Sequence, residues 1–255
     1  MDTNKIYNMD CLQGMKMIPD KAVDMILSDL PQGYTRNDWD VIIPFTDLWD
    51  QYSRVIKDDG AIILFGNGMF TADLMYSKRE LWRYNLIWEK TTATGFLNAR
   101  RMPLRAHEDI CVFYKRMPFY YPQMIPGNKP VHNYTKHTSD GTNYGKTKIG
   151  ISGGGSTYRF PQSVLKFPTD KQKSKIHPTQ KPVDLCAFLI KSFTDKNELV
   201  LDSCTGSASI PIACILSNRK YIAFETNKKY YKMAVKRIEQ ILSDMSPKTN
   251  NLSVD

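Results

Sequence analysis

The chain alternates short apolar runs with amphipathic stretches, and one irregular segment interrupts this alternation. Residues 23–27 and 61–66 are apolar runs of strand length. The apolar side chains of 45–56 recur at helical spacing, and we expect Gly60 to end that helix. The alternation resumes after residue 177. Wholly apolar strands separated by helices are typical of a mostly parallel sheet covered on both faces, so the sequence predicts an α/β protein.

The interrupting segment, residues 115–176, differs from the rest of the chain in composition. It holds seven of the 14 glycines and six of the 14 prolines, which disfavour long helices and strands. We therefore expect residues 1–114 and 177–243 to form the two halves of one domain, with 115–176 inserted between them. The polar residues 244–255 are expected to form a flexible tail.

The insertion also carries the net charge of the chain. It has 11 Lys or Arg and two acidic residues, whereas the remaining residues carry 24 of each sign and the chain totals +9. Eight aromatic residues are interleaved with these cations. Such a composition is typical of a nucleic-acid-binding surface, and we expect Lys146, Lys148 and Arg159 to contact DNA. A solvated, flexible insertion is the alternative.

Several protein classes are disfavoured by the composition. The chain has no run of about 18 apolar residues, and its N-terminal stretch "MDTNKIYNMD" is unlike a signal peptide. We therefore expect no membrane segment and a cytoplasmic location. The five cysteines and four histidines show no paired spacing, so we expect neither a disulfide framework nor a metal site.

Two turns that follow predicted strands carry candidate functional residues. Residues 28–34, "SDLPQGY", place a carboxylate, a proline and a glycine directly after the apolar run 23–27. Residues 199–214, "LVLDSCTGSASIPIAC", are typical of a strand, a turn of small residues and a helix. Open α/β sheets bind ligands at the carboxyl ends of their strands, and a small-residue turn before a helix suits a nucleotide-type ligand. Alone, such a turn is more often a simple connection.

The order of these motifs resembles the β-class of amino-group DNA methyltransferases. Asp29-Leu30-Pro31-Gln32 is similar to that family's (D/N/S)PP(Y/F) motif, and 201–209 is similar to its LDPFxGSGT loop. The segment "HPTQKP" at 177–182 and the stretch 85–115, with its "W-x-K" and "HEDI", match further family segments. The catalytic motif comes before the recognition region and the cofactor loop, which is the permuted order of this class. The resemblance covers nearly all of residues 5–238.

This resemblance implies a Rossmann-like methyltransferase fold with a mostly parallel, seven-stranded sheet and an irregular target-recognition insertion. It implies S-adenosylmethionine as the cofactor and double-stranded DNA as the substrate, methylated at adenine N6 or cytosine N4. Asp29 and the carbonyl of Leu30 would hold the amine hydrogens, because an amine whose lone pair is delocalised is a poor nucleophile until it is positioned. The base must be flipped out of the duplex and held by stacking. Pro31, Gln32 and Tyr34 complete the expected catalytic site.

The resemblance also implies a set of cofactor-binding residues. Asp202 and the turn at Gly206 would hold the methionine end, and Glu225 would accept hydrogen bonds from the ribose hydroxyls. Asp10 would meet the adenine amine, and it also fits a helix N-cap. Residues of the 177–182 segment would cover the methionine end: His177, Thr179, Lys181 and Pro182. The other members of the cofactor loop are Cys204, Ser207 and Ala208.

Three departures from the family pattern bear on activity. Gln32 replaces the stacking aromatic, a loss of about 1 to 3 kcal/mol of base contact unless Tyr34 takes its place. Ala208 replaces a glycine, which costs on the order of 1 kcal/mol if the backbone there has a positive φ. Ser203-Cys204 replaces a Pro-Phe pair.

Two functions of different classes therefore fit the sequence. The first is an active methyltransferase, and an aspartate at position 29 favours adenine N6 over cytosine N4. The second is a catalytically inactive homologue that binds DNA or another protein. A methyltransferase acting on RNA or protein fits less well, because the permuted order and the large basic insertion favour DNA. The sequence leaves open a homodimer, the recognition sequence and a cognate restriction nuclease.

Overall fold

The structure is a computed structural model that describes residues 1–35, 37–136, 151–169 and 180–245. The chain divides into two compact units, the first made of residues 1–121 and 163–255 and the second of residues 122–162. The second unit lies inside the predicted insertion and is shorter than it at both ends. Most of the predicted tail falls outside the described residues.

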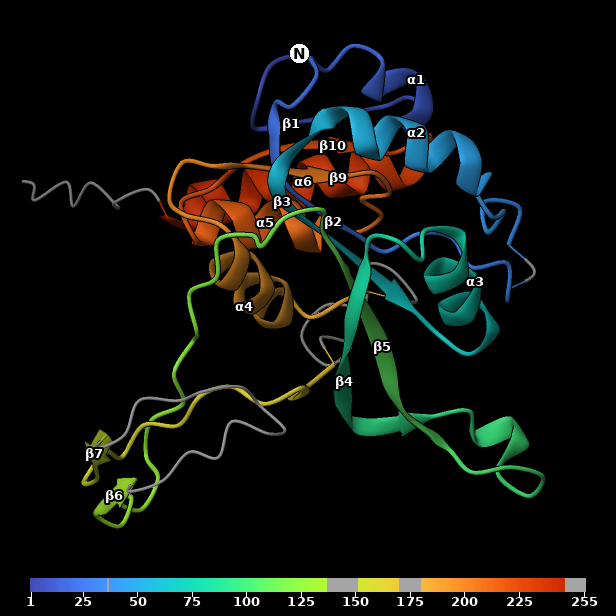
Figure 1. Ribbon diagram of the computed structural model, residues 1–255. Coiled ribbons are helices and arrows are strands. Elements are labelled where there is room, and N and C mark those ends of the chain that lie inside the picture. Colours follow the sequence, from blue (N-terminus) through green and yellow to red (C-terminus); the bar gives the residue numbers. More distant parts are fainter. Residues whose placement is uncertain (36, 137–150, 170–179, 246–255) are drawn as a thin grey trace, which may run out of the picture. The chain divides into compact units, whose positions relative to one another are not determined.

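Within the described residues, the first unit is built on one eight-stranded sheet (Figure 1). Its strands lie in the order β1 (Lys5–Tyr7), β10 (Lys220–Phe224), β9 (Leu199–Asp202), β2 (Val23–Ser28), β3 (Ile56–Gly66), β5 (Arg105–Phe113), β4 (Trp82–Thr94) and β8 (Val164–Phe167). Every neighbouring pair is parallel except the two made by β5, which runs antiparallel to β3 and β4. The predicted mostly parallel α/β architecture is confirmed.

The sheet has one strand more than the seven predicted. β8 comes from the segment predicted to be irregular, and it pairs in parallel with β4, with Val164 opposite Ile87. Leu165 of this strand is buried, and the indole of Trp88 donates a hydrogen bond of 2.9 Å to the carbonyl of Phe167. β8 has only four residues and lies at the edge of the sheet, so Leu165 is its one buried side chain. So short a segment gives no periodic pattern from which a strand could be predicted.

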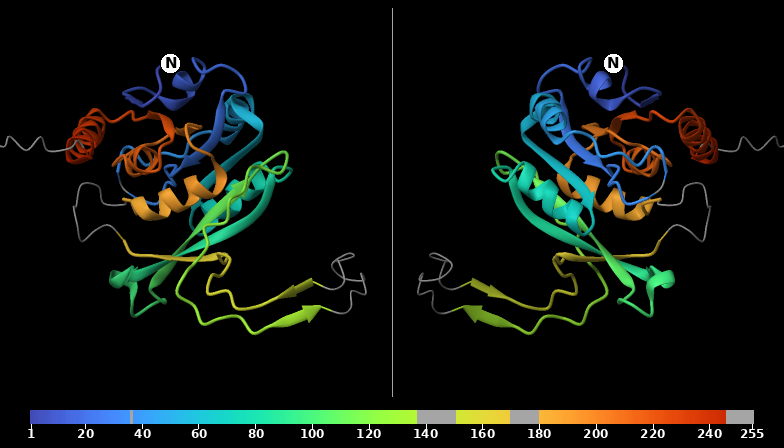
Figure 2. Two further views of the ribbon diagram at one scale, coloured as in Figure 1. Left: turned by 90° about the vertical axis from the view of Figure 1, so that its left-hand side faces the viewer. Right: turned by 90° about the vertical axis from the view of Figure 1, so that its right-hand side faces the viewer.

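Helices cover both faces of the sheet (Figure 2). One buried cluster packs α1 (Cys11–Met15), α2 (Phe45–Val55) and α3 (Met69–Ser77) against the sheet, and the other packs α4 (Val183–Phe193), α5 (Ser209–Leu216) and α6 (Lys228–Met245). Along β2, Met25 and Leu27 belong to the second cluster and Ile26 to the first, as the two-residue period of a strand requires. None of the described helices is long and apolar enough to cross a membrane.

Helix α2 ends at Val55, earlier than the predicted end at Gly60. The residues from Ile56 onward extend β3 instead, and a register shift separates its first pair with β2 from the rest of the ladder. A Cβ added at Gly60 would lie 2.7 Å from the carbonyl oxygen of Asp24. The glycine therefore permits the close approach of β3 to β2, and it does not terminate a helix.

Three adjacent parallel strands end at the same edge of the sheet. β2, β9 and β10 are neighbours, and they bring together the turns that begin at Asp29, Ser203 and Glu225. In an open α/β sheet this edge is where ligands bind. The fold therefore joins both turns predicted from the sequence, although they are some 170 residues apart in the chain.

The second unit has little regular structure in its described part. β6 (Tyr134–Lys136) pairs antiparallel with β7 (Ile151–Gly153), and an isolated bridge joins Ile125 to Arg159. The guanidinium of Arg159 donates to the backbone carbonyls of Ser156, Tyr158 and Lys129. This arginine therefore helps to hold the backbone of its own unit.

Candidate active site

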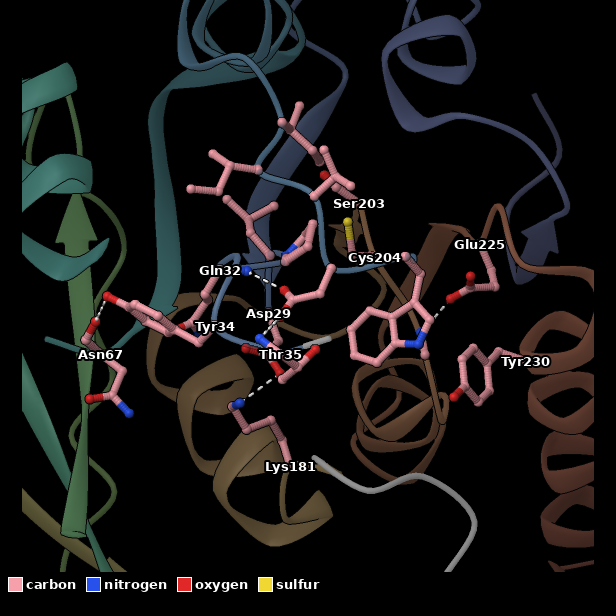
Figure 3. Close-up of a pocket in the computed structure, with 18 of the residues that line it drawn as sticks. Asp29, Gln32, Tyr34, Thr35, Asn67, Lys181, Ser203, Cys204, Glu225 and Tyr230 are labelled. Carbon is pink, nitrogen blue, oxygen red and sulfur yellow. Dashed lines mark hydrogen bonds and ion pairs between the residues drawn. The ribbon is translucent and has the colours of Figure 1, made fainter. Parts of the chain in front are cut away.

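The turns after β2, β9 and β10 line one cavity of about 570 Å³ (Figure 3). Its lining includes the following residues predicted from the sequence: Asp10, Asp29, Leu30, Pro31, Gln32, Tyr34, Lys181, Cys204, Gly206 and Glu225. Other predicted residues are absent from the lining, although the structure describes them: Pro182, Asp202, Ser207 and Ala208. The predicted residues His177 and Thr179 lie outside the described residues.

Asp202 is fully buried and folds the turn after β9. Its Oδ1 accepts hydrogen bonds from the hydroxyl of Ser28 at 3.1 Å and from the amide of Cys204 at 3.2 Å. Its Oδ2 accepts a third from the hydroxyl of Thr205 at 2.8 Å. Burial raises the pKa of this carboxyl to about 7, against the effect of these hydrogen bonds. Asp202 thus stabilises the turn after β9 without lining the cavity itself.

Ala208, at the start of α5, has a left-handed backbone. Its φ is 63° and its ψ is 27°, and the side chain is buried. Gly206, two residues earlier, has a φ of 48°. The backbone φ at Ala208 is therefore positive, which is the case in which an alanine is strained. The turn carries a strain on the order of 1 kcal/mol that a glycine would avoid.

Glu225, directly after β10, binds the turn that follows β9, which we call the cofactor turn. Its Oε2 accepts a hydrogen bond of 2.9 Å from the amide of Gly206, and its Oε1 accepts one of 2.8 Å from the amide of Asn227. Burial raises the pKa of Glu225, and the two amides partly offset this rise. Each carboxylate oxygen retains a lone pair, so the group can accept further hydrogen bonds from a ligand in the cavity.

Two aromatic rings and a second carboxylate also line the cavity. Trp39 and Tyr230 meet edge to face, with ring centroids 6.0 Å apart. Asp10 caps α1, where its Oδ1 accepts a hydrogen bond of 3.0 Å from the amide of Gln13. The cavity therefore combines flat apolar surface with carboxylate acceptors, which suits a nucleoside.

Asp40 organises the turn that carries the predicted catalytic residues. Its Oδ1 accepts from the amides of Gln32 at 2.8 Å and Gly33 at 2.9 Å, and its Oδ2 accepts from the amide of Thr35 at 2.7 Å. Burial alone would raise the pKa of Asp40, but the hydrogen bonds from Thr35, Gly33 and Gln32 outweigh burial and lower it. Asp40 was not predicted from the sequence.

Asp29 lies at one end of a chain of four alternating charges. Lys181 Nζ lies 2.6 Å from Asp29 Oδ2 and 3.1 Å from Glu108 Oε2. Lys90 Nζ lies 2.6 Å from Glu108 Oε1, and both lysine side chains are only 7% exposed. The structure thus brings Lys181, which was predicted to cover the methionine end of the cofactor, to the carboxylate of Asp29.

The four charges cancel, and each supports the ionisation of its neighbours. Burial raises the pKa of Asp29, and the ammonium of Lys181 opposes that rise. Burial would likewise raise the pKa of Glu108, but Lys181 and Lys90 outweigh it and the pKa is lowered. Burial favours a lower pKa for Lys181, yet the two carboxylates raise it. Buried charges are tolerated when paired in this way.

Gln32 and Tyr34, the two candidates for holding a base, are placed differently. The side chain of Gln32 lies beside the carboxyl of Asp29 and helps to lower that group's pKa. The hydroxyl of Tyr34 accepts a hydrogen bond of 2.8 Å from the amide of Phe70 and donates one of 2.9 Å to the carbonyl of Asn67. Tyr34 is 53% exposed, so its ring faces the open side of the cavity.

Comparison with known proteins places this geometry in a family. The N6_N4_Mtase family model, described as DNA methylase, matches residues 32–236. This chain belongs to that DNA methylase family. A relative, the type II methyltransferase M1.MboII of Moraxella bovis, is 26% identical, and the match covers 92% of this chain and 96% of that protein.

Another relative, the DNA adenine methyltransferase YhdJ of Escherichia coli K12, is 24% identical over 99% of this chain and 91% of its own length. The crystal structure of an M1.HpyAVI–S-adenosylmethionine complex has a TM-score of 0.60 at 22% identity, with 91% of this chain and 98% of that chain covered. The predicted family, the Rossmann-like methyltransferase fold and the S-adenosylmethionine cofactor are confirmed.

The cavity of this DNA methylase fits S-adenosylmethionine. Its volume of about 570 Å³ lies in the range of small-molecule sites. Trp39 and Tyr230 offer aromatic surface for a purine, and Asp10 and Glu225 offer acceptors for an amine and for hydroxyls. The turn at Gly206 brings backbone to the cavity wall without a side chain.

The sequence missed several polar or aromatic residues of this DNA methylase site, among them Tyr230 on α6. Asp40 and Trp39 lie in the loop after the catalytic motif, where no periodic pattern exists. Lys90 and Glu108 belong to the "W-x-K" and "HEDI" stretches, which were recognised as family segments without a role. Of the predicted DNA contacts, Arg159 lies in the second unit, and Lys146 and Lys148 lie outside the described residues. All three stay predictions.

Proposed function

We propose that this DNA methylase transfers a methyl group from S-adenosylmethionine to the N6 amine of adenine in double-stranded DNA. One observation carries the proposal: Asp29 and the cofactor turn with Glu225 line a single cavity. A base amine held at Asp29 would therefore lie beside the cofactor. Positioning of this kind supplies a large part of the rate of a group transfer.

The expected chemistry needs little more than hydrogen-bond acceptors at the amine. Bound S-adenosylmethionine supplies an electrophilic methyl group on a positively charged sulfur. The Asp29 carboxylate oxygen that Lys181 does not engage would accept one amine hydrogen, and the carbonyl of Leu30 would accept the other. The lone pair is then directed at the methyl carbon. Asp29 takes up the proton that the amine releases, and the ammonium of Lys181 favours the ionised carboxylate before that point.

The cofactor would be held by the residues around the second turn. Glu225 is placed to accept the ribose hydroxyls, and Asp10 is placed to accept the adenine amine. Trp39 and Tyr230 would contact the purine ring. They would supply the aromatic surface that is lost because Cys204 stands where the family pattern has phenylalanine. An apolar, partly closed site of this kind strengthens the hydrogen bonds formed within it.

The family includes both adenine-N6 and cytosine-N4 enzymes. Adenine is the proposed target here because the catalytic motif begins with an aspartate, Asp29. The type II methyltransferases among its relatives support a role in modifying a specific DNA sequence. The target base would be flipped into the cavity past Gln32 and Tyr34.

An inactive homologue is the second candidate function. The observations that favour it are the amide at position 32, which has no ring to stack on a base, and the strained alanine at position 208. Such a protein would retain the cavity and bind DNA or another protein through it or through the basic insertion.

The test is calorimetric titration with S-adenosylmethionine, followed by transfer of tritiated methyl groups to unmethylated DNA. We expect cofactor binding and transfer, with Asp29→Ala binding the cofactor and transferring nothing. Binding without transfer in the wild type supports the inactive homologue. No binding at millimolar cofactor rules out both the cofactor site and the proposed reaction.

A further inference from the structure

A projecting turn between β4 and β5, residues 94–105, has no role in the chemistry above. We call it the hairpin tip, and Figure 1 shows the two strands continuing beyond the rest of the sheet to reach it. Gly95 has a φ of 97°, and the 3-10 turn η1 (Phe96–Asn98) follows it. The amide of Asn98 donates a hydrogen bond of 2.9 Å to the carbonyl of Gly95, and the amide of Ala99 donates one of 3.1 Å to the carbonyl of Phe96. The backbone of the tip is therefore defined by its own hydrogen bonds.

This ordered turn displays large apolar side chains to solvent. Leu97 is 102% exposed, Phe96 is 72% exposed and Met102 is 58% exposed. A single exposed apolar residue needs no explanation, but three of them on one short turn form a patch that is typical of a binding surface. A Cβ added at Gly95 would have no neighbour within 4 Å among the described residues, so the turn is open to solvent at that point.

The charge of the hairpin tip selects an anionic partner. Residues 94–105 contain Arg100, Arg101 and Arg105 and no acidic residue. A partner that accepts apolar side chains between cations is either a nucleic acid, whose bases stack between phosphates, or an anionic membrane surface.

The base of the tip favours DNA over a membrane. Thr94 and Arg105 pair across the two strands, and both line the cavity that contains Asp29. A base that enters this cavity leaves a gap in the duplex next to the hairpin tip. Proteins that distort DNA fill such gaps with Phe, Leu or Met side chains flanked by arginines.

We propose that the hairpin tip is a DNA wedge, in which Phe96 and Leu97 enter the base stack beside the target nucleotide while Arg100 and Arg101 contact phosphates. The wedge rests on the proposed function, because it acts where a flipped base enters the cavity. It stabilises the flipped state by replacing the stacking that the duplex loses. The hairpin tip shares no residue with the predicted basic insertion, residues 115–176.

The first test measures binding without requiring catalysis. A fluorescein-labelled 30-base-pair duplex is prepared fully paired and with one central abasic site, and wild type is compared with a Phe96→Ser/Leu97→Ser double variant by anisotropy. Opening the stack beforehand makes entry of the wedge easier, so wild type should bind the abasic duplex about tenfold more tightly. The double variant should bind both duplexes alike. Tyr76→Ser on α3, also a highly exposed aromatic at 83%, is the matched control and should behave as wild type.

Arginine variants separate the electrostatic part of the wedge. Arg100→Gln/Arg101→Gln should reduce the slope of log affinity against log salt by about two, close to one unit for each lost phosphate contact. The same proteins are mixed with vesicles containing 30% phosphatidylserine. Vesicle binding by wild type that the Ser double variant loses, with the abasic preference unchanged, would assign the tip to a membrane and overturn the wedge.

Methyl transfer distinguishes failure of the wedge from failure of the proposed function. If wild type transfers methyl groups and the Ser double variant transfers them equally well to native plasmid, the wedge is wrong and the function stands. If wild type transfers none but shows the abasic preference that the double variant lacks, the wedge stands and the reaction is wrong. Equal binding of both duplexes by wild type overturns the wedge in either case.

Discussion

Lys181 Nζ lies 2.6 Å from Oδ2 of Asp29, in a contact that joins the catalytic turn to a segment more than 150 residues later in the chain. The lysine is only 7% exposed and also contacts Glu108, so its ammonium is held between two carboxylates. An ammonium fixed in this position orients Asp29 and opposes the rise in its pKa that burial causes. The proposed reaction needs an ionised acceptor at Asp29, and this contact favours ionisation of the carboxyl.

Lys181→Met therefore tests the role of the ion pair. Without the ammonium the pKa of Asp29 should rise further, because the largest effect that opposes burial is lost. A higher pKa moves the acid limb of the pH–rate profile to higher pH, and we expect transfer at pH 7 to fall at least about tenfold. Lys166→Met is the matched control, since Lys166 is 67% exposed and pairs with Glu89 on the surface. An unchanged profile in Lys181→Met would remove the ion pair from the mechanism.

Asp40→Ala tests the carboxylate that holds the catalytic turn. It removes the acceptor of three backbone amides, and hydrogen bonds to a charged group contribute about 1.5 to 3 kcal/mol each. We expect the amides of Gln32, Gly33 and Thr35 to lose protection against hydrogen exchange and the transfer rate to fall about 10- to 100-fold. The control is Asp38→Ala, at an exposed acid two residues earlier. Retained protection at these amides would contradict the assigned role.

Gln32→Tyr tests whether base capture limits the enzyme. The tyrosine removes the side-chain amide beside Asp29 and adds a ring that can stack on a flipped base. A stacking gain of about 1 to 3 kcal/mol predicts a rise in kcat/KM for DNA of roughly 5- to 150-fold. Gln32→Leu removes the amide without adding a ring and should show little of this rise. Equal gains in both variants would place the limitation in the amide contact.

Asp202→Asn tests the buried carboxyl through the pH dependence of stability. Burial raises its pKa to about 7 from 3.8, so between these values the folded protein holds a proton that the unfolded chain has released. The sign follows: the free energy of unfolding falls as pH rises from about 4 to 7, by up to about 4 kcal/mol from this group. In Asp202→Asn this contribution disappears, so denaturant titrations from pH 4 to 8 should show a flatter curve. A slope equal to that of wild type would mean that Asp202 stays ionised.

Some of this site could be predicted from sequence because it depends on local position. Asp29 and Glu225 directly follow apolar strands, and parallel strands bring such residues to one edge of a sheet. The fold class followed from the same alternation. Lys181 was found as a motif residue, but its partner depends on how α4 packs, and no local pattern carries that information.

Other features depend on tertiary contacts alone. Asp40 accepts the amides of the catalytic turn only because an irregular loop folds back onto that turn. Glu108 reaches the site through its ion pair with Lys181, which lies just before α4. β8 was missed because a four-residue edge strand with one buried side chain, lying in a segment rich in Gly, Pro and basic residues, gives no strand pattern. Gly60 was assigned to a helix end because the sequence shows the glycine but not the strand carbonyl that approaches it.

The most direct test of the central claim is nucleoside mass spectrometry of plasmid DNA from a methylation-deficient host that expresses this chain. We expect N6-methyladenine with wild type and none with Asp29→Asn, which keeps the shape of the side chain but lacks the charge that accepts the amine proton. The Asn variant should still bind S-adenosylmethionine, because Asp10 and Glu225, the proposed acceptors for its nucleoside, lie on other elements. Unmodified DNA with wild type, or equal N6-methyladenine with both proteins, would contradict the account.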